Sequence, residues 1–145
     1  MFKHVLVPTD FGPPSARALE FGIEMARRFG AKLTLLHTYE IPAFAYAGME
    51  YAPGDLSRMV ANAARDELDA TLAAVKKQVP DADSVLHQGV PWQQILSTVD
   101  EIHADLVVMG THGRTGLRHA LLGSVAEKVV RLAHVPVMTV HDARN

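Results

Sequence analysis

The residues with the clearest capacity for chemistry lie between positions 110 and 124, in a segment rich in glycine. Gly110 and Gly113 are separated by two residues, and Gly123-Ser124 follows after nine more. Glycine lets the backbone approach a ligand without a Cβ in the way, and a turn of this kind exposes consecutive N–H groups to an anion. Ser124 is expected to open a helix, whose free N–H groups and positive dipole end attract phosphate. The segment therefore predicts a phosphate-binding loop.

Two arginines, Arg114 and Arg118, add positive charge inside this loop. No Gly-Lys-Ser/Thr follows the glycines, so the loop is not a Walker A motif, and its spacing is not that of the G-x-G-x-x-G dinucleotide fingerprint. The alternative interpretation is an ordinary connection between a strand and a helix, in which the glycines serve close packing alone.

A carboxylate ends the first apolar run, in Pro8-Thr9-Asp10. A buried strand that ends in a carboxylate presents this group at the carboxyl edge of the sheet. There it would suit the hydroxyl groups of a ribose, which are donors, while the glycine-rich loop takes the phosphates. The alternative role for Asp10 is that of a helix cap or a solvated loop residue.

Strands and helices alternate along the chain in a way that would bring these two features together. Short apolar runs at 5–7, 33–37, 84–88, 106–109 and 136–140 predict strands, and helical periodicity predicts helices at 15–29, from 55 or 57 to about 79, from 91 through 102, and from 123 through 132. This order predicts one α/β domain over residues 1–145, with a parallel sheet and helices on both faces. In the strand order 3-2-1-4-5, the first and fourth strands are neighbours at the point where the winding reverses, and a crevice opens above them. The irregular stretch at 40–54 predicts a functional loop or a lid.

Composition excludes several classes of function. The chain has no cysteine, which excludes disulfides, thiolate zinc sites and thiol catalysis. Its formal net charge of −2 argues against a general affinity for nucleic acid or for an anionic membrane. The eight histidines show no metal-ligand spacing of a known type, and no apolar run is long enough to span a bilayer. The first residues do not form a secretory signal, so we expect a cytoplasmic protein.

The sequence resembles the universal stress protein family over essentially its whole length. The resemblance rests on Pro8-Thr9-Asp10, on the loop from Gly110 to Ser124, and on residues 125–130 followed by Pro136-Val137. The loop has the form associated with the ATP-binding members of the family. The resemblance implies a Rossmann-like fold, of the adenine nucleotide alpha hydrolase type, and a homodimer formed through the last strand, from Pro136 to Val140.

The family resemblance also implies ligand contacts at matching positions. On the adenosine side it implies Pro8, Thr9 and Asp10, with Thr38 against the adenine and Gly89 and Val90 at the rim. Around the ribose and phosphates it implies Met109, Gly110, Thr111, His112, Gly113, Arg114, Gly123, Ser124 and Val125. ATP would arrive with Mg²⁺ or Mn²⁺, which needs few protein ligands in such a site.

Three functional hypotheses follow. The first is an ATP-binding regulatory homodimer of the stress response, with an unidentified protein partner. The second is an enzyme that uses the same crevice, either a weak ATPase or a phosphoryl or nucleotidyl transferase. The third is a dimeric interaction module that binds no nucleotide. No general base is evident beside the expected phosphates, and we therefore expect at most slow hydrolysis.

Overall fold

The computed structural model describes residues 1–41, 53–112 and 122–142. Five parallel strands form one sheet in the order β3-β2-β1-β4-β5, which confirms the predicted topology. The strands are β1 (His4–Pro8), β2 (Lys32–Tyr39), β3 (Asp83–Gln88), β4 (Leu106–Gly110) and β5 (Val137–Val140). The helices are α1 (Pro13–Phe29), α2 (Pro53–Lys76), α3 (Pro91–Ile102) and α4 (Ser124–Leu132). Most of the irregular stretch at 40–54 lies outside the described residues.

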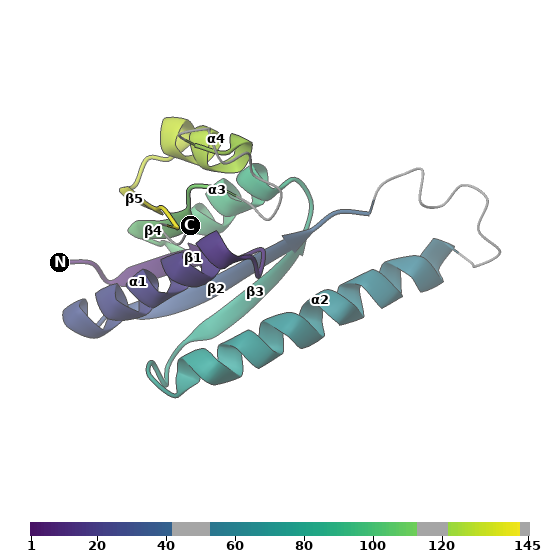
Figure 1. The fold of residues 1–145 in the computed structure, drawn as a ribbon, viewed down its shortest axis with the longest axis horizontal. Coiled ribbons are helices and arrows are strands. Elements are labelled where there is room, and N and C mark those ends of the chain that lie inside the picture. Colours follow the sequence, from purple (N-terminus) through teal and green to yellow (C-terminus); the bar gives the residue numbers. More distant parts are fainter. Residues whose placement is uncertain (42–52, 113–121, 143–145) are drawn as a thin grey trace.

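The helices cover the sheet in two layers (Figure 1), with α1 and α2 on one face and α3 and α4 on the other. Successive side chains of a strand point to opposite faces of the sheet, so each strand contributes apolar side chains to both layers. Val5 and Val7 of β1 pack towards α1, whereas Leu6 between them packs towards α3 and α4, and all three side chains are fully buried. A strand that is apolar on both faces is the pattern of a parallel sheet covered by helices, which explains why these short runs contain so little polar sequence.

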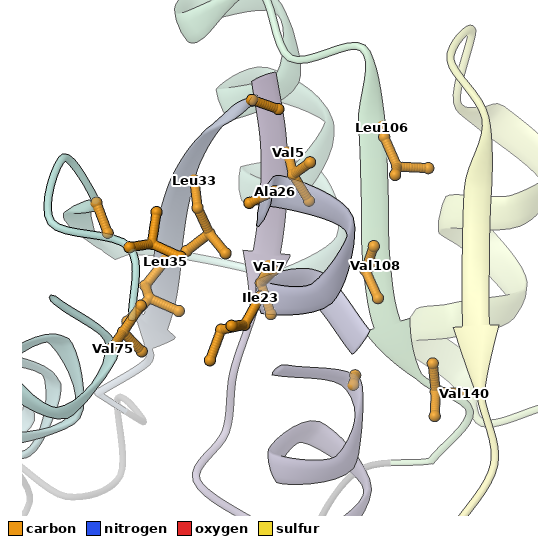
Figure 2. Packing of buried hydrophobic residues seen from close by; sticks show 14 of the residues in the cluster. Val5, Val7, Ile23, Ala26, Leu33, Leu35, Val75, Leu106, Val108 and Val140 are labelled. Carbon is orange, nitrogen blue, oxygen red and sulfur yellow. The ribbon is translucent and has the colours of Figure 1, made fainter. Parts of the chain in front are cut away.

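Figure 2 shows the larger core on the α1 and α2 side, where β-branched and leucine side chains of the strands meet the helices. Gly22 of α1 lies directly against this core, because a Cβ added there would stand 2.5 Å from Cγ2 of Val7. The helix ends at Gly30, which has the left-handed conformation (φ 61°) that glycine adopts without cost. The close approach of α1 to β1 therefore depends on a glycine in the middle of the helix.

Helical periodicity predicts that Met59 and Ala63 share one apolar side of α2 with Ala64, Leu68 and Val75. The last three are buried, but Met59 is 64% exposed and Ala63 is also exposed. The contacts of α2 with the sheet are with β2 and β3, at one edge of the sheet. Figure 1 shows the first turns of this long helix extending beyond the strands, so they have no sheet to pack against.

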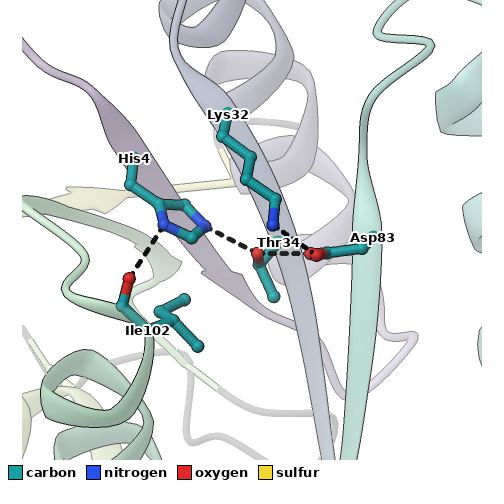
Figure 3. Close-up of polar contacts among 5 residues, drawn as sticks. All are labelled: His4, Lys32, Thr34, Asp83 and Ile102. Atoms are coloured by element: carbon teal, nitrogen blue, oxygen red, sulfur yellow. Dashed lines mark hydrogen bonds and ion pairs between the residues drawn. The ribbon is translucent and has the colours of Figure 1, made fainter.

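A polar cluster joins three strands at the amino end of the sheet (Figure 3). The His4 ring places Nδ1 3.0 Å from the carbonyl oxygen of Ile102 and Nε2 2.7 Å from Oγ1 of Thr34, which is itself 2.5 Å from Oδ1 of Asp83. Lys32 Nζ lies 2.7 Å from the other oxygen of Asp83. Burial, followed by the positive charge of Lys32, holds the pKa of His4 below its ordinary value. The amino end of the sheet thus carries a cluster of titratable groups.

Candidate functional site

A cavity of about 470 Å³ opens at the carboxyl end of the sheet, above β1 and β4. These neighbouring strands lead to helices on opposite faces, so the cavity lies at the topological switch point, where ligands bind in sheets of this class. Its volume falls within the range of small-molecule sites. The lining residues are Pro8, Thr9, Asp10, Ser15, Leu36, Thr38, Pro91, Ile95, Met109, Gly110, Thr111, His112, Leu122, Gly123, Ser124, Val125 and Ala126.

Asp10 is oriented by the turn that joins β1 to α1. Its Oδ1 accepts hydrogen bonds from the Gly12 N–H (2.9 Å) and from the Ser15 hydroxyl (2.8 Å). The carboxylate therefore stabilises the entry to α1 and also forms part of the cavity wall. The N-cap of α1 is Gly12 and has no side-chain cap hydrogen bond, so Asp10 is not itself the helix cap that the sequence left open. Asp10 lines the cavity, and its contact with a ligand stays a prediction.

The end of β2 holds the same turn from the side. Thr9 donates its N–H to the Leu36 carbonyl (2.8 Å), and its own carbonyl accepts from Nδ1 of His37 (2.8 Å). Phe11 follows with a φ of 62°, an unusual conformation for a residue with a Cβ. Its ring lies 4.4 Å from the His37 ring, centre to centre.

The glycine-rich loop joins β4 to α4 on the other side of the cavity. Gly123 precedes α4 and donates its N–H to the Thr111 carbonyl at 2.6 Å. Both glycines that border the described part of the loop are tightly enclosed. A Cβ on Gly110 would stand 2.9 Å from the carbonyl carbon of Pro14, and one on Gly123 would stand 3.1 Å from the Thr111 oxygen. The first turn of α4 lines the cavity, so its free N–H groups form a site of positive potential there.

A pair of histidines stands beside this loop. Thr111 Oγ1 lies 3.0 Å from Nδ1 of His112 and 3.3 Å from Nδ1 of His141, which follows β5. His112 lines the cavity, and the centre of the His141 ring lies 6.1 Å from that of the His112 ring. Among the described residues, no group of three or more His, Cys, Asp or Glu is arranged to hold a metal ion.

The cavity brings together eleven of the fifteen residues that the sequence suggested. They are Pro8, Thr9, Asp10, Thr38, Met109, Gly110, Thr111, His112, Gly123, Ser124 and Val125. Gly89 and Val90 are not in its wall, although the next residue, Pro91, is. Gly113 and Arg114 lie outside the described residues. That these residues contact a ligand stays a prediction.

Six lining residues were not identified from the sequence: Ser15, Leu36, Pro91, Ile95, Leu122 and Ala126. The signal for Leu36 was present, because side chains two apart on a strand share a face and Thr38 was already a candidate. The helical periodicity predicts for Ser15 only a place at the start of a helix. Its hydroxyl is buried and bonded to Asp10, and this contact depends on the conformation of the intervening turn.

The fold and the cavity define a doubly wound parallel α/β protein with a cavity of small-molecule size at its switch point. The model of the Universal stress protein family matches residues 1–141, and the chain belongs to this family. It is 33% identical over 144 residues to the universal stress protein MJ0531 of Methanocaldococcus jannaschii, covering 97% of this chain and 82% of that protein.

Solved structures show the same fold. The structure of MJ0577, also named as a universal stress protein of M. jannaschii, superposes with a TM-score of 0.82 at 25% identity and covers 100% of this chain and 99% of that one. A universal stress protein solved in complex with cAMP superposes with a TM-score of 0.70 at 24% identity, covering 97% of each chain. In the described ranges of this chain, none of the helices combines the length and apolarity needed to cross a membrane.

Proposed function

We propose that this chain binds an adenine nucleotide, with ATP as its ligand, and acts as a cytoplasmic regulatory homodimer in the stress response. The observation that carries the proposal is one cavity that faces the Asp10 carboxylate on one side and the first turn of α4 on the other. A carboxylate suits ribose hydroxyls, and a helix N-terminus with a serine suits phosphates. A fold relative in complex with cAMP supports the choice of an adenine nucleotide.

The proposed pose places the adenosine over the ends of β1 and β2 and the phosphates at the glycine-rich loop. Thr38 and Leu36 form the floor beneath the base, and Asp10 takes the ribose hydroxyls. The phosphates then lie at the backbone of Gly123 and Ser124, next to Thr111 and His112. Mg²⁺ or Mn²⁺ would be held mainly by the phosphates themselves, because the described residues offer no protein cluster for it.

Calorimetry on purified protein tests this site. We expect wild-type protein to bind ATP in the micromolar range, and Asp10→Asn to bind it about tenfold more weakly. The reason is that the amide keeps an oxygen for the Gly12 and Ser15 bonds but loses the charge that strengthens a ribose bond. Asp81→Asn, an exposed carboxylate that follows α2, is the matched control and should bind normally.

Mass spectrometry of the nucleotide released on denaturation, followed by titrations with ADP, AMP and cAMP, would establish which adenine nucleotide is preferred. Protein that releases no nucleotide and shows no thermal shift with ATP would instead be a nucleotide-free interaction module. Sustained turnover of labelled ATP would indicate the enzymatic alternative.

Dimerisation is proposed to use β5, an edge strand of the sheet. The carbonyl groups of Pro136 and Val140 accept bonds from β4, so by alternation the backbone of Thr139 faces away from the sheet. Val130 and Leu132 of the neighbouring α4 expose apolar side chains, at 44% and 50%.

Thr139→Pro removes an outward N–H that the monomer does not need. We expect it to produce a folded monomer by light scattering, and a Thr139→Pro dimer would exclude pairing through this edge.

A further inference from the structure

The turn that carries Asp10 contains a strained residue, because Phe11, which follows Asp10 and does not itself line the cavity, has a left-handed conformation (φ 62°). An L-residue with a bulky side chain adopts this region at a cost, and it persists only where the surroundings fix it. Such strain is common where a functional group must be held in a direction that the relaxed chain would not adopt. The contacts around Phe11 therefore indicate how Asp10 is oriented.

Four hydrogen bonds originate in the turn itself. Thr9 Oγ1 accepts the Phe11 N–H at 3.0 Å, and Asp10 Oδ1 accepts the Gly12 N–H at 2.9 Å. Ser15 Oγ approaches both Thr9 and Asp10. These bonds tie the turn to α1, but none of them ties it to the sheet.

The sheet holds the turn through β2. The N–H of Thr9 bonds to the Leu36 carbonyl, and the carbonyl of Thr9 accepts from Nδ1 of His37, each at 2.8 Å. Thr9 is thus fixed on both its N–H and its C=O, one residue before Asp10. The ring of His37 also lies against the ring of Phe11, at 4.4 Å and a tilt of 46°.

The hydrogen bond assigns the tautomer of His37. A carbonyl oxygen only accepts, so Nδ1 must carry the hydrogen in both the neutral and the charged ring. His37 itself does not line the cavity, whereas Leu36 and Thr38 on either side of it do. Because side chains alternate along a strand, His37 projects from the opposite face of β2 and can influence a ligand only through the turn.

We propose that His37 is a positioning residue of the nucleotide site, whose Nδ1–H fixes the Thr9 carbonyl and thereby aims the Asp10 carboxylate at the ribose. This inference rests on the proposed function. His37 of β2 would thus contribute to nucleotide binding by orienting the turn that faces the ligand.

Two substitutions separate the donor from the ring. His37→Asn keeps an N–H donor at the position of Nδ1 and removes the ring, whereas His37→Phe keeps a ring against Phe11 and removes the donor. We expect ATP to bind His37→Asn with nearly wild-type affinity and His37→Phe about fivefold more weakly, which corresponds to one net hydrogen bond. His87→Phe is the control, because His87 lies opposite Thr38 on the adjacent strand and its ring faces Glu101. It should bind ATP as the wild type does.

A second measurement distinguishes a change in the orientation of Asp10 from a general loss of stability. If His37 aims Asp10 at the ribose, the preference for ATP over 2′,3′-dideoxy-ATP should shrink in His37→Phe towards its value in Asp10→Asn. It should persist in His37→Asn. A fold that is merely less stable would weaken both ligands equally.

Three results would overturn the inference: equal affinity in wild type and His37→Phe, weaker binding by both His37 variants, or an unchanged preference between the two nucleotides in His37→Phe. If wild-type protein binds no adenine nucleotide, the proposed function fails and this inference fails with it. If wild type and Asp10→Asn behave as proposed while His37→Phe binds normally, only the role of His37 is refuted.

Discussion

Replacing Gly110 by alanine tests how closely the start of α1 must approach the end of β4, beside the cavity. The backbone of Gly110 is not in the left-handed region, so alanine brings no conformational penalty there. Its Cβ, however, would stand 2.9 Å from both the carbonyl carbon and the Cβ of Pro14, and 3.1 Å from the Pro14 oxygen. Favourable carbon contacts begin near 3.5 Å. The start of α1 would therefore have to move by about half an ångström.

The expected cost follows from what must move. The obstacle is helix backbone, which cannot rotate away as a flexible side chain can. Overpacking of this kind typically costs about 1–3 kcal/mol. We take about 2 kcal/mol for Gly110→Ala, which for a chain of 145 residues lowers Tm by about 6 °C. Nucleotide affinity should fall as well, because the displaced segment includes Ser15, the partner of Asp10.

Urea unfolding and calorimetry measure the two effects. Gly54→Ala is the matched control, since a Cβ at Gly54 in α2 meets no atom within 4 Å. In that variant the free energy of unfolding should stay the same or rise by up to about 1 kcal/mol from helix propensity. The steric argument is refuted if Gly110→Ala unfolds within about 0.5 kcal/mol of wild type, or if Gly54→Ala loses as much stability as Gly110→Ala.

Three further predictions concern the sheet and its amino end. Gly22→Ala should lower the free energy of unfolding by about 2 kcal/mol through overpacking, because the new Cβ would lie 2.5 Å from Cγ2 of the fully buried Val7. A double-mutant cycle with Val7→Ala should show strong coupling between the two positions. Additive costs of the two substitutions would contradict this contact. Burial and then Lys32 lower the pKa of His4, while Asp83 and Asp105 act to raise it. Because the folded state favours the neutral His4 ring, the contribution of His4 to the free energy of unfolding is complete above the ordinary pKa of 6.5. This contribution is lost as the pH falls below that value. Urea unfolding between about pH 7.5 and about pH 5 should show this slope in wild type and a smaller one in His4→Asn, and equal slopes would refute it. Asp105→Ala should cost about 1 kcal/mol at neutral pH in the same assay, since its carboxylate accepts the N–H groups of Lys3 and His4. An unchanged urea midpoint would show that these bonds contribute nothing to stability.

The alternation of strands and helices could be predicted from the sequence because it depends on local signals, whereas the strand order and the crevice that follows from it were supplied by the resemblance to a family of known fold. Apolar runs such as Val5-Leu6-Val7 indicate strands buried on both faces, and the handedness of βα units leaves few ways to arrange five of them. The glycines at 110 and 123 and the carboxylate at 10 then fall at the same edge of the sheet.

The features that the sequence did not predict depend on register and on backbone conformation. The contacts of Thr34 with His4 and with Asp83 require β1, β2 and β3 to pair in one particular alignment. The left-handed Phe11 has no signal in residue type, since aromatic residues rarely adopt that conformation. The exposure of Met59 depends on how far α2 extends past the sheet, which helical periodicity alone does not contain.

Strand β1 is only five residues long, and its two ends face different chemistry. His4 belongs to the titratable cluster, Pro8 belongs to the cavity wall, and three fully buried residues separate them. Protonation of His4 at one end and binding of a ligand at the other would both shift the unfolding equilibrium, although the two sites are not in contact. A ligand at about 100 times its Kd adds about 2.7 kcal/mol to the native state. Saturation with nucleotide should therefore allow the protein to withstand an acid shift that unfolds the empty form, with the ionisation of His4 itself unaltered.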